Sequence, residues 1–259
     1  MSNLRTVFAS VAALQEMPGD QVFIGRRDSQ LLYGEEFVIE ERQGGWAKGV
    51  STRDGYKGWV RLDLLGEWQN ATHAVDSRMT HIYPEPNFKT HPKDMLSFMS
   101  RLSISGDAVC GFLPLNKEGS AWVPENHLIS LKDMATQPRD IVETAMMFNG
   151  APYVYGGRAA WGLDCSAVIQ LAAQRNGIFC PRDTDQQVLM LGEAIEIEEI
   201  KRGDLIYFPG HVGIMVDDKN CLNATVRHMQ VVIEPLDEME RIYDKGEGDP
   251  IIGVRRLEI

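Results

Sequence analysis

The feature that most constrains the fold is a change of pattern near residue 135. Before it, short runs of β-branched and aromatic residues alternate with Gly-containing turns, which is typical of strands. After it, two segments with helical spacing come first, and apolar runs such as GDLIYF and HVGIMV follow. A chain of 259 residues has room for about two or three domains. We therefore predict small all-β modules followed by one α+β domain.

The β-rich half contains a degenerate repeat. The segments GWVRLDLL and SAWVPENHLI both carry Trp-Val, then four residues, then an aliphatic residue. The separation of Trp59 and Trp122 is about the size of one small barrel. A polar stretch with one Pro, between Leu131 and Arg139, precedes the first helical pattern. The predicted domains are two small barrels at residues 1–70 and 71–132 and the α+β domain at residues 138–259.

Charge and composition exclude several classes of protein. The chain has 26 Lys and Arg against 37 Asp and Glu, a net charge of −11, whereas a nucleic-acid binder needs a basic face. No apolar run reaches the roughly 18 residues of a membrane span. The run from Val7 to Leu14 is followed at once by Glu16 and Pro18, which favours a first strand over an export signal. The four cysteines have no paired or zinc-binding spacing. We expect a reduced, cytoplasmic protein with no membrane or nucleic-acid partner and no metal.

Cys165 has the setting of a nucleophile. It lies between the Gly-rich loop YVYGGRAAWGLD and the helical pattern SAVIQLAAQRNG, so its sulfur would lie at a helix N-terminus, where the thiolate is favoured. The alternative is a small core residue, which is what most free cysteines are. Cys110, Cys180 and Cys221 lack this setting, and we expect them to be structural.

His211 and Asn223 are the candidate partners of this thiol. His211 opens the strand HVGIMV directly after Pro209-Gly210, and Asn223 lies on the next strand. The two side chains share a sheet face only if the connection between the strands has an odd number of residues. A neutral amide then fixes the ring orientation and the tautomer of the imidazole. The alternatives are a core histidine and a turn or edge asparagine.

These segments carry a family resemblance. GLDCSAVIQ, RGDLIYFPGHVGIMV, and NAT with QVVIEPL together resemble the NlpC family of bacterial cell-wall cysteine peptidases, over residues 139–257. The resemblance implies a papain-like α+β fold, Cys165 as nucleophile, His211 as general base, and no metal or organic cofactor. Ala167 stands where the family usually has Gly. Asn223 stands where a His is commoner, which leaves His228 as an alternative orienting residue.

The N-terminal half resembles the paired SH3-like domains of γ-D-glutamyl-L-diamino acid dipeptidyl-peptidases. In that subgroup the first SH3-like domain closes one end of the active site, so that only a peptide with a free N-terminal L-Ala fits. The resemblance implies these substrate-binding residues: Asp28, Tyr56, Asp183, Thr184, and the backbone of Asp164 and Ser166, with the Cys165 N–H as oxyanion donor.

The chemistry of these residues agrees with that role, because a buried ammonium needs carboxylates such as Asp28 and Asp183. Each residue also has a structural alternative. Tyr56 fits a barrel aromatic, Asp28 a turn former, and Asp183 a helix N-cap.

The expected activity is hydrolysis of the γ-D-glutamyl bond to diaminopimelate or L-Lys in free murein peptides. Two alternatives remain open: a non-catalytic wall- or peptide-binding protein, and an amidase or acyltransferase that uses the same thiol. The sequence does not distinguish diaminopimelate from Lys and does not indicate the oligomeric state.

Overall fold

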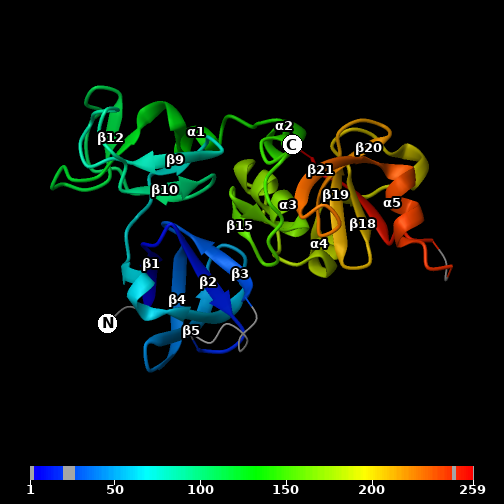
Figure 1. Ribbon diagram of the computed structural model, residues 1–259, viewed down its shortest axis with the longest axis horizontal. Helices are drawn as coiled ribbons and strands as arrows, with labels where there is room; N and C mark the ends of the chain where they lie inside the picture. The colour runs from blue at the N-terminus through cyan, green and yellow to red at the C-terminus, as the bar shows by residue number, and fades with distance from the viewer. Residues whose placement is uncertain (1–2, 20–26, 247–248, 259) are drawn as a thin grey trace. The chain divides into compact units, whose positions relative to one another are not determined.

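The computed structural model describes residues 3–19, 27–246 and 249–258. The chain forms two compact units, Met1–Thr136 and Gln137–Ile259, and each is described by itself (Figure 1). Unit 1 is rich in strands, and unit 2 contains both helices and strands. This is the α+β arrangement with an N-terminal β-rich region that the change of pattern near residue 135 predicts.

The first part of unit 1 is one antiparallel sheet with the strand order β3-β2-β6-β5-β4-β1-β7. Its elements are β1 (Leu4–Val7), β2 (Val11–Gln15), β3 (Arg27–Leu32), β4 (Glu36–Gln43), β5 (Trp46–Ser51), β6 (Lys57–Arg61), the 3₁₀ turn η1 (Leu62–Leu64) and β7 (Leu65–Glu67). Alternate residues of these strands, among them Leu14, Phe37 and Val60, point inward and form a buried core.

The second part of unit 1 consists of small sheets, β10-β9, β11-β8-β14 and β12-β13. Its elements are β8 (His73–Val75), β9 (Met79–Ile82), β10 (Asp94–Ser97), β11 (Arg101–Leu102), β12 (Phe112–Pro114), β13 (Trp122–Pro124), the 3₁₀ turn η2 (Glu125–His127), β14 (Leu128–Ser130) and α1 (Leu131–Met134). The repeat predicted from the sequence is present in the structure as a repeated order of elements. Both β6-η1-β7 and β13-η2-β14 consist of a strand, a 3₁₀ turn and a second strand.

Two expectations for unit 1 need correction. In the part of the chain that the structure describes, neither segment pairs into a closed barrel: β3 and β7 remain edges of the first sheet, and the second segment divides into separate sheets. Strands of two to four residues in that segment are too short to pair continuously around a barrel. The polar stretch after Leu131 begins with α1, which Ser130 caps by accepting a hydrogen bond from the Asp133 N–H.

The two β segments of unit 1 meet at Gly34. The Arg101 N–H donates to the Tyr33 carbonyl at 2.8 Å, and Tyr33 also packs against the core of the second segment. A Cβ on Gly34, which has φ +77°, would lie 1.8 Å from the Arg101 carbonyl oxygen. Only glycine fits this contact. The division of this unit at residue 70 stays a prediction.

Unit 2 is built around one antiparallel sheet with the order β17-β22-β18-β19-β20-β21. The strands of this sheet are β17 (Glu193–Ala194), β18 (Leu205–Phe208), β19 (His211–Met215), β20 (Asn220–Thr225), β21 (Gln230–Pro235) and β22 (Gly253–Arg256). The short strands β15 (Arg158–Ala159) and β16 (Gly162–Leu163) of unit 2 pair separately. Its helices are α2 (Ile141–Met146), α3 (Cys165–Arg175), α4 (Thr184–Met190), the 3₁₀ turn η3 (Ile197–Glu199) and α5 (Leu236–Tyr243).

The helices of unit 2 cover both faces of this sheet (Figure 1). Helix α3, buried along its whole length, packs against β19 and β20. Helix α5 buries Leu236 and Met239 against Ile206, Phe208 and Met215 of the sheet. The helices and the strands β18, β19 and β20 predicted from the sequence are present, whereas α5 was not predicted. No helix within the described ranges has the length and apolar character needed to span a membrane.

Candidate active site

Cys165 is the first residue of α3, as the sequence predicts. Asp164 caps this helix, since its Oδ1 accepts from the Ala167 N–H at 2.9 Å. The other carboxylate oxygen, Oδ2, accepts from the Gly156 N–H at 2.9 Å. One carboxylate therefore fixes both the start of the helix and the Gly-rich loop before it, and this holds the nucleophile between them.

The sulfur of Cys165 is more enclosed than the sequence suggested. The side chain is 8% exposed. Burial raises the pKa of the thiol to about 12, and the Asp164 carboxylate adds to this, although the Val212 N–H, Arg182 and the Ser166 N–H act in the opposite direction. Burial thus acts against the thiolate that the helix N-terminus favours. A thiol in this setting needs a neighbouring base.

His211 begins β19 close to this sulfur. The Val212 N–H, directly after His211, is hydrogen-bonded to the Cys165 sulfur. The imidazole stacks on Tyr243, with centroids 5.3 Å apart and planes at 16°, and Tyr243 stacks in turn on Phe208. Burial lowers the pKa of His211 to about 4, opposed by the hydrogen bond with Asn223. Burial thus favours the neutral imidazole, which keeps one ring nitrogen as a base.

Asn223 contacts the imidazole as predicted. Its Oδ1 lies 3.1 Å from His211 Nε2, and its Nδ2 donates to Glu234 Oε2 at 3.0 Å. A carboxylate cannot donate, so the amide nitrogen faces Glu234 and the amide oxygen faces the ring, an assignment made from the network. His211 Nε2 then carries the hydrogen, and Nδ1 keeps a free lone pair.

The register of β19 and β20 explains this contact. Ile214 pairs with Leu222 and Met215 with Cys221, so the connection has the odd length that the sequence analysis required. The same register brings Gly213 opposite Asn223. A Cβ on Gly213 would lie 2.3 Å from Cys221 Sγ and 3.3 Å from the Asn223 Cβ, so this glycine leaves the space that the Asn223 side chain occupies.

Asp164 and Ser166, predicted to bind substrate through their backbone, have side chains engaged in a buried network. Arg182, 1% exposed, donates to Asp164 at 3.0 and 2.5 Å and to the Ser166 hydroxyl at 2.6 Å. The sequence analysis missed Arg182, because nothing in the run CPRDTD distinguishes it from a surface arginine. The side chains of Asp164 and Ser166 thus hold the nucleophile in place, and only their backbone groups remain for a substrate.

The other predicted substrate residues are distributed over both units. Asp183 and Thr184 are half-buried at the start of α4, and the Asp183 side chain makes no capping hydrogen bond to that helix. Tyr56 is half-buried against the core of unit 1, and Asp28 is half-buried on β3. The substrate roles of these four residues stay predictions.

His228, the alternative orienting residue, has another partner. Its Nε2 lies 3.2 Å from Glu234 Oε1, and its side chain is half exposed. The sequence analysis also missed Glu234 itself. The sequence feature that could have indicated Glu234 is a carboxylate within the otherwise apolar run VVIEPL. This run lies on β21, the strand that pairs with the strand of Asn223.

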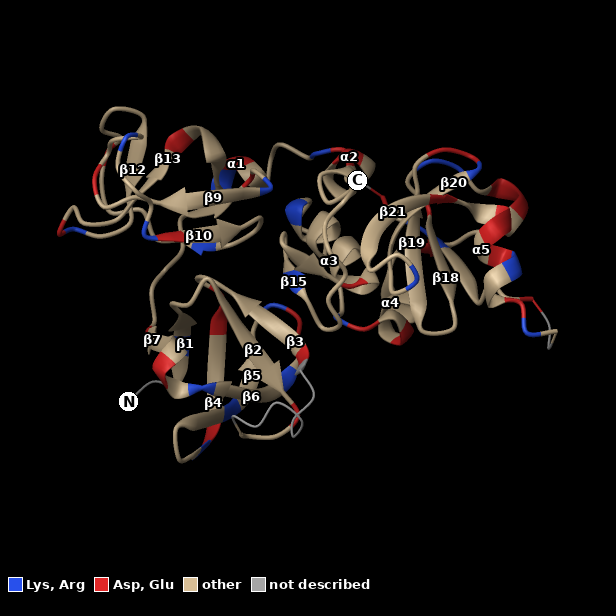
Figure 2. Cartoon of the chain, viewed as in Figure 1, with Lys and Arg blue, Asp and Glu red and all other residues tan. Residues whose placement is uncertain are grey.

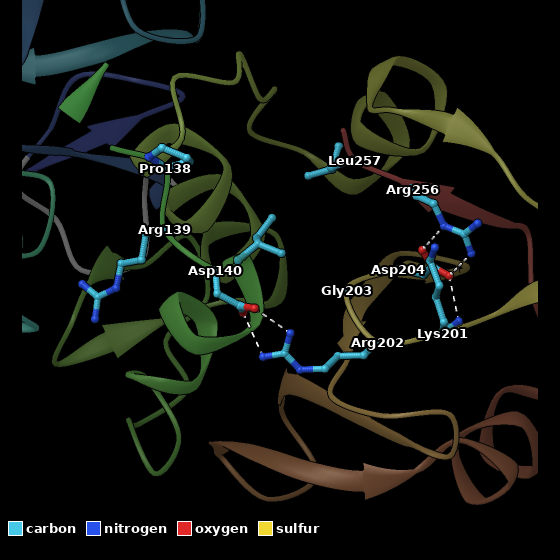
Figure 3. A pocket seen from close by; sticks show the side chains of 10 residues that line it. Pro138, Arg139, Asp140, Lys201, Arg202, Gly203, Asp204, Arg256 and Leu257 are labelled. Atoms are coloured by element: carbon cyan, nitrogen blue, oxygen red, sulfur yellow. Dashed lines mark hydrogen bonds and ion pairs between the residues drawn. The ribbon is translucent and has the colours of Figure 1, made fainter. Parts of the chain in front are cut away.

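A cavity of about 410 Å³ lies elsewhere in unit 2 (Figure 3). Its two prominent guanidinium groups are engaged: Arg202 with Asp140 at 2.6 and 2.9 Å, and Arg256 with Asp204 at 2.8 and 2.7 Å. Cys165, His211 and Asn223 do not line it. These ion pairs tie the start of α2 and the end of β22 to the loop before β18, and the cavity is no part of the thiol site.

A thiol at a helix start, an imidazole at a strand start and an amide oriented by the next strand define a cysteine peptidase of papain-like fold. Residues 150–244 match the NlpC/P60 family, and residues 23–65 match the bacterial dipeptidyl-peptidase SH3 domain. The chain carries an NlpC/P60 cysteine peptidase domain and, N-terminal to it, a bacterial SH3 domain.

Curated relatives and a solved structure extend this likeness along the chain. The γ-D-glutamyl-L-lysine dipeptidyl-peptidase of Bacillus cereus is 28% identical over 81% of this chain and 71% of the relative. The dipeptidyl-peptidase 6 of Lysinibacillus sphaericus is 27% identical over 88% and 91%. The crystal structure of an NlpC/P60 family protein from Bacillus cereus superimposes with a TM-score of 0.81, at 21% identity, over 98% of this chain and 99% of that one, which supports the fold.

Proposed function

We propose that this protein hydrolyses the γ-D-glutamyl–L-diamino acid bond of murein peptides that begin with a free L-Ala. One observation carries the proposal: a thiol, imidazole and amide site lies in the same chain as an SH3 domain of the bacterial dipeptidyl-peptidase type. Two relatives, from Bacillus cereus and Bacillus subtilis, are named γ-D-glutamyl-L-lysine dipeptidyl-peptidase, at 28% and 26% identity. The diamino acid is diaminopimelate or L-Lys.

The proposed reaction has an acylation and a deacylation step. The Cys165 sulfur attacks the γ-carbonyl carbon while His211 Nδ1 takes the thiol proton, and the Cys165 N–H donates to the developing oxyanion. The imidazolium then gives its proton to the leaving amine as the C–N bond breaks, which leaves a thioester. Water attacks the thioester with His211 as base, and this releases L-Ala-γ-D-Glu and restores the thiol.

Specificity for a free amine requires an acceptor for the substrate ammonium. Asp183 is the leading candidate, because a buried ammonium needs a carboxylate partner and Asp183 lies half-buried at the start of α4. Asp28, Tyr56, Thr184 and the backbone of Asp164 and Ser166 are the other proposed substrate-binding groups. The second β segment of unit 1 is proposed to be a further SH3-like domain of unassigned role.

The proposed setting is cytoplasmic, with released murein peptides as substrates in cell-wall recycling. Fractionation of cells that carry the tagged full-length chain tests this part separately. Recovery of the protein outside the cytoplasmic fraction would contradict it.

The test of the proposed activity compares two peptides. L-Ala-γ-D-Glu followed by L-Lys or diaminopimelate is incubated with the protein, beside the same peptide with an acetylated N-terminus, and the products are identified by mass spectrometry. Cleavage of the free-amine peptide alone, abolished in Cys165→Ala, is the expected result. Equal cleavage of both peptides would contradict the ammonium pocket. Binding without cleavage would favour a peptide-binding protein, and transfer of the acyl group to an added amine would favour an acyltransferase.

A further inference from the structure

The Asn223 amide has two orientations of nearly identical shape, and only one of them serves the proton transfer. With Oδ1 toward the ring, His211 Nε2 carries the hydrogen and Nδ1 is basic. With Nδ2 toward the ring, Nε2 would have to accept, so that the hydrogen would reside on Nδ1. A thiol could then not transfer its proton to the neutral ring. A neighbouring group must therefore fix the direction of the Asn223 amide.

Glu234 meets the amide from the far side. The register of β20 and β21 pairs Cys221 with Glu234 and Asn223 with Val232, so Glu234 is the diagonal neighbour of Asn223 on the same face of the sheet. Its Oε2 accepts from Asn223 Nδ2 at 3.0 Å. The Glu234 side chain is only 7% exposed, and that of Asn223 is fully enclosed.

Glu234 is held in its acceptor-only form. Arg227 Nη2 forms an ion pair with Glu234 Oε1, and His228 Nε2 lies 3.2 Å from the same oxygen. Burial acts to raise the pKa of Glu234, but the hydrogen bonds from Asn223, Arg227 and His228 and the charge of Arg227 outweigh it and lower the pKa. Arg227 and His228 lie in the turn between β20 and β21. The β20–β21 hairpin therefore supplies the Asn223 amide, the Glu234 carboxylate and the Arg227 cation.

We propose that Glu234 is a positioning residue of the peptidase: it fixes the direction of the Asn223 amide and thereby keeps His211 in the tautomer whose Nδ1 is free to take the Cys165 proton. Glu234 acts through Asn223 and touches neither substrate nor sulfur. A glutamine at this position could not do the same, because its amide both donates and accepts and would allow the Asn223 amide to turn over. The inference rests on the Cys165–His211 mechanism described above and is independent of the identity of the peptide.

The first experiment reads the tautomer and needs no substrate. Long-range ¹H–¹⁵N correlation spectra of ¹⁵N-histidine-labelled full-length protein assign the hydrogen of the His211 ring to Nδ1 or Nε2, with His211→Gln used to identify its signals. We expect the Nε2–H form in the wild type and a mixture of both forms in Glu234→Gln. An Nδ1–H ring in the wild type would overturn the proposal, and this result does not depend on how any variant folds.

The second experiment measures whether the effect of Glu234 on catalysis depends on Asn223. Hydrolysis of L-Ala-γ-D-Glu-L-Lys is compared for the wild type, Glu234→Gln, Asn223→Ala and the double variant. We expect Glu234→Gln to lower kcat about tenfold to a hundredfold with KM little changed, as for loss of a hydrogen bond to a charged group. In the Asn223→Ala background the same substitution has no further effect, because there is no amide left to orient.

Glu238→Gln is the matched control. It also removes one carboxylate, but from the exposed surface of α5, where acidic residues gather (Figure 2), and we expect wild-type kcat and tautomer. An unchanged kcat in Glu234→Gln, or a full additional loss in the Asn223→Ala background, would overturn the positioning role. If the wild type does not cleave the peptide, the proposed function fails, while the tautomer measurement still decides on Glu234.

Discussion

Asn223 lies diagonally across the β19–β20 ladder from His211, because its direct partner on β19 is Gly213 and His211 is two residues further along the same face. This offset brings the amide oxygen to 3.1 Å from Nε2. Diagonal neighbours on one sheet face are about 7–8 Å apart, within reach of long or aromatic side chains, and Gly213 has no side chain to stand between the amide and the ring. The ring, the amide and the carboxylate of Glu234 follow one another across three adjacent strands.

Gly213→Ala is expected to damage both stability and activity. The added Cβ would lie 2.3 Å from Cys221 Sγ and 3.3 Å from the Asn223 Cβ, and overpacking of this kind costs about 1–3 kcal/mol. Denaturant unfolding and peptide hydrolysis measure the two effects. Gly213→Ala combined with Cys221→Ala recovers stability if the sulfur is the obstacle. Gly45→Ala is the control, since a Cβ there meets nothing within 4 Å; equal losses at both glycines would contradict the steric explanation.

The sequence predicted most of this site because its main parts are local. The helix starts at Cys165 because Asp164 can cap it, and the strand starts at His211 because Pro209-Gly210 ends the preceding turn. The relation between His211 and Asn223 required only the length of one hairpin, and the register of β19 and β20 confirms that expectation.

The remaining residues of the site could not be predicted, because their contacts come from packing. Arg182 reaches Asp164 only through the approach of two loops around α3. Tyr243 stacks on His211 from the end of α5, a helix that the sequence analysis did not predict although Leu236, Met239 and Tyr243 have helical spacing. The contacts of Glu234 with Asn223 and Arg227 depend on the pairing of β20 and β21, and the burial of the Cys165 sulfur depends on the packing around α3.

We expect substitution of Arg182 to lower the urea concentration at which unit 2 unfolds. Arg182→Met leaves the Asp164 carboxylate buried without its cation, which costs about 3–5 kcal/mol. Arg202→Met is the control in the same unit, because both side chains of the Arg202–Asp140 pair are 40% or more exposed, and such a pair contributes about 0–1 kcal/mol. Equal losses in the two variants, measured by urea unfolding, would contradict a special role for the buried pair.

Acid is expected to destabilise the protein through His211. Its pKa is about 4 in the folded protein, chiefly because burial disfavours the charged ring, whereas an unfolded histidine has a pKa of about 6.5. The unfolded chain therefore takes up the proton first. The stability contribution is complete above about pH 6.5 and is lost as the pH falls toward 4, by about 3 kcal/mol.

Unfolding free energies at pH 7 and pH 4 for the wild type and His211→Gln measure this contribution. The variant loses less stability between the two pH values than the wild type. His91→Gln, which removes an exposed histidine, retains the wild-type difference. If His211→Gln loses as much stability on acidification as the wild type, the buried neutral imidazole is not the cause.

Asp183→Asn is expected to lower activity chiefly through KM. The Asp183 carboxylate precedes α4 without capping it, so the substitution removes no capping hydrogen bond from that helix. For the free-amine peptide, kcat/KM falls about tenfold or more, because the ammonium loses its charged acceptor, and the effect appears chiefly in KM.

Asp140→Asn is the contrasting variant. Asp140 caps α2 through the Glu143 N–H at 2.9 Å and pairs with Arg202, and its substitution lowers stability without changing KM. If Asp183→Asn instead destabilises the protein and leaves KM at the wild-type value, Asp183 is a structural residue and the ammonium must bind elsewhere.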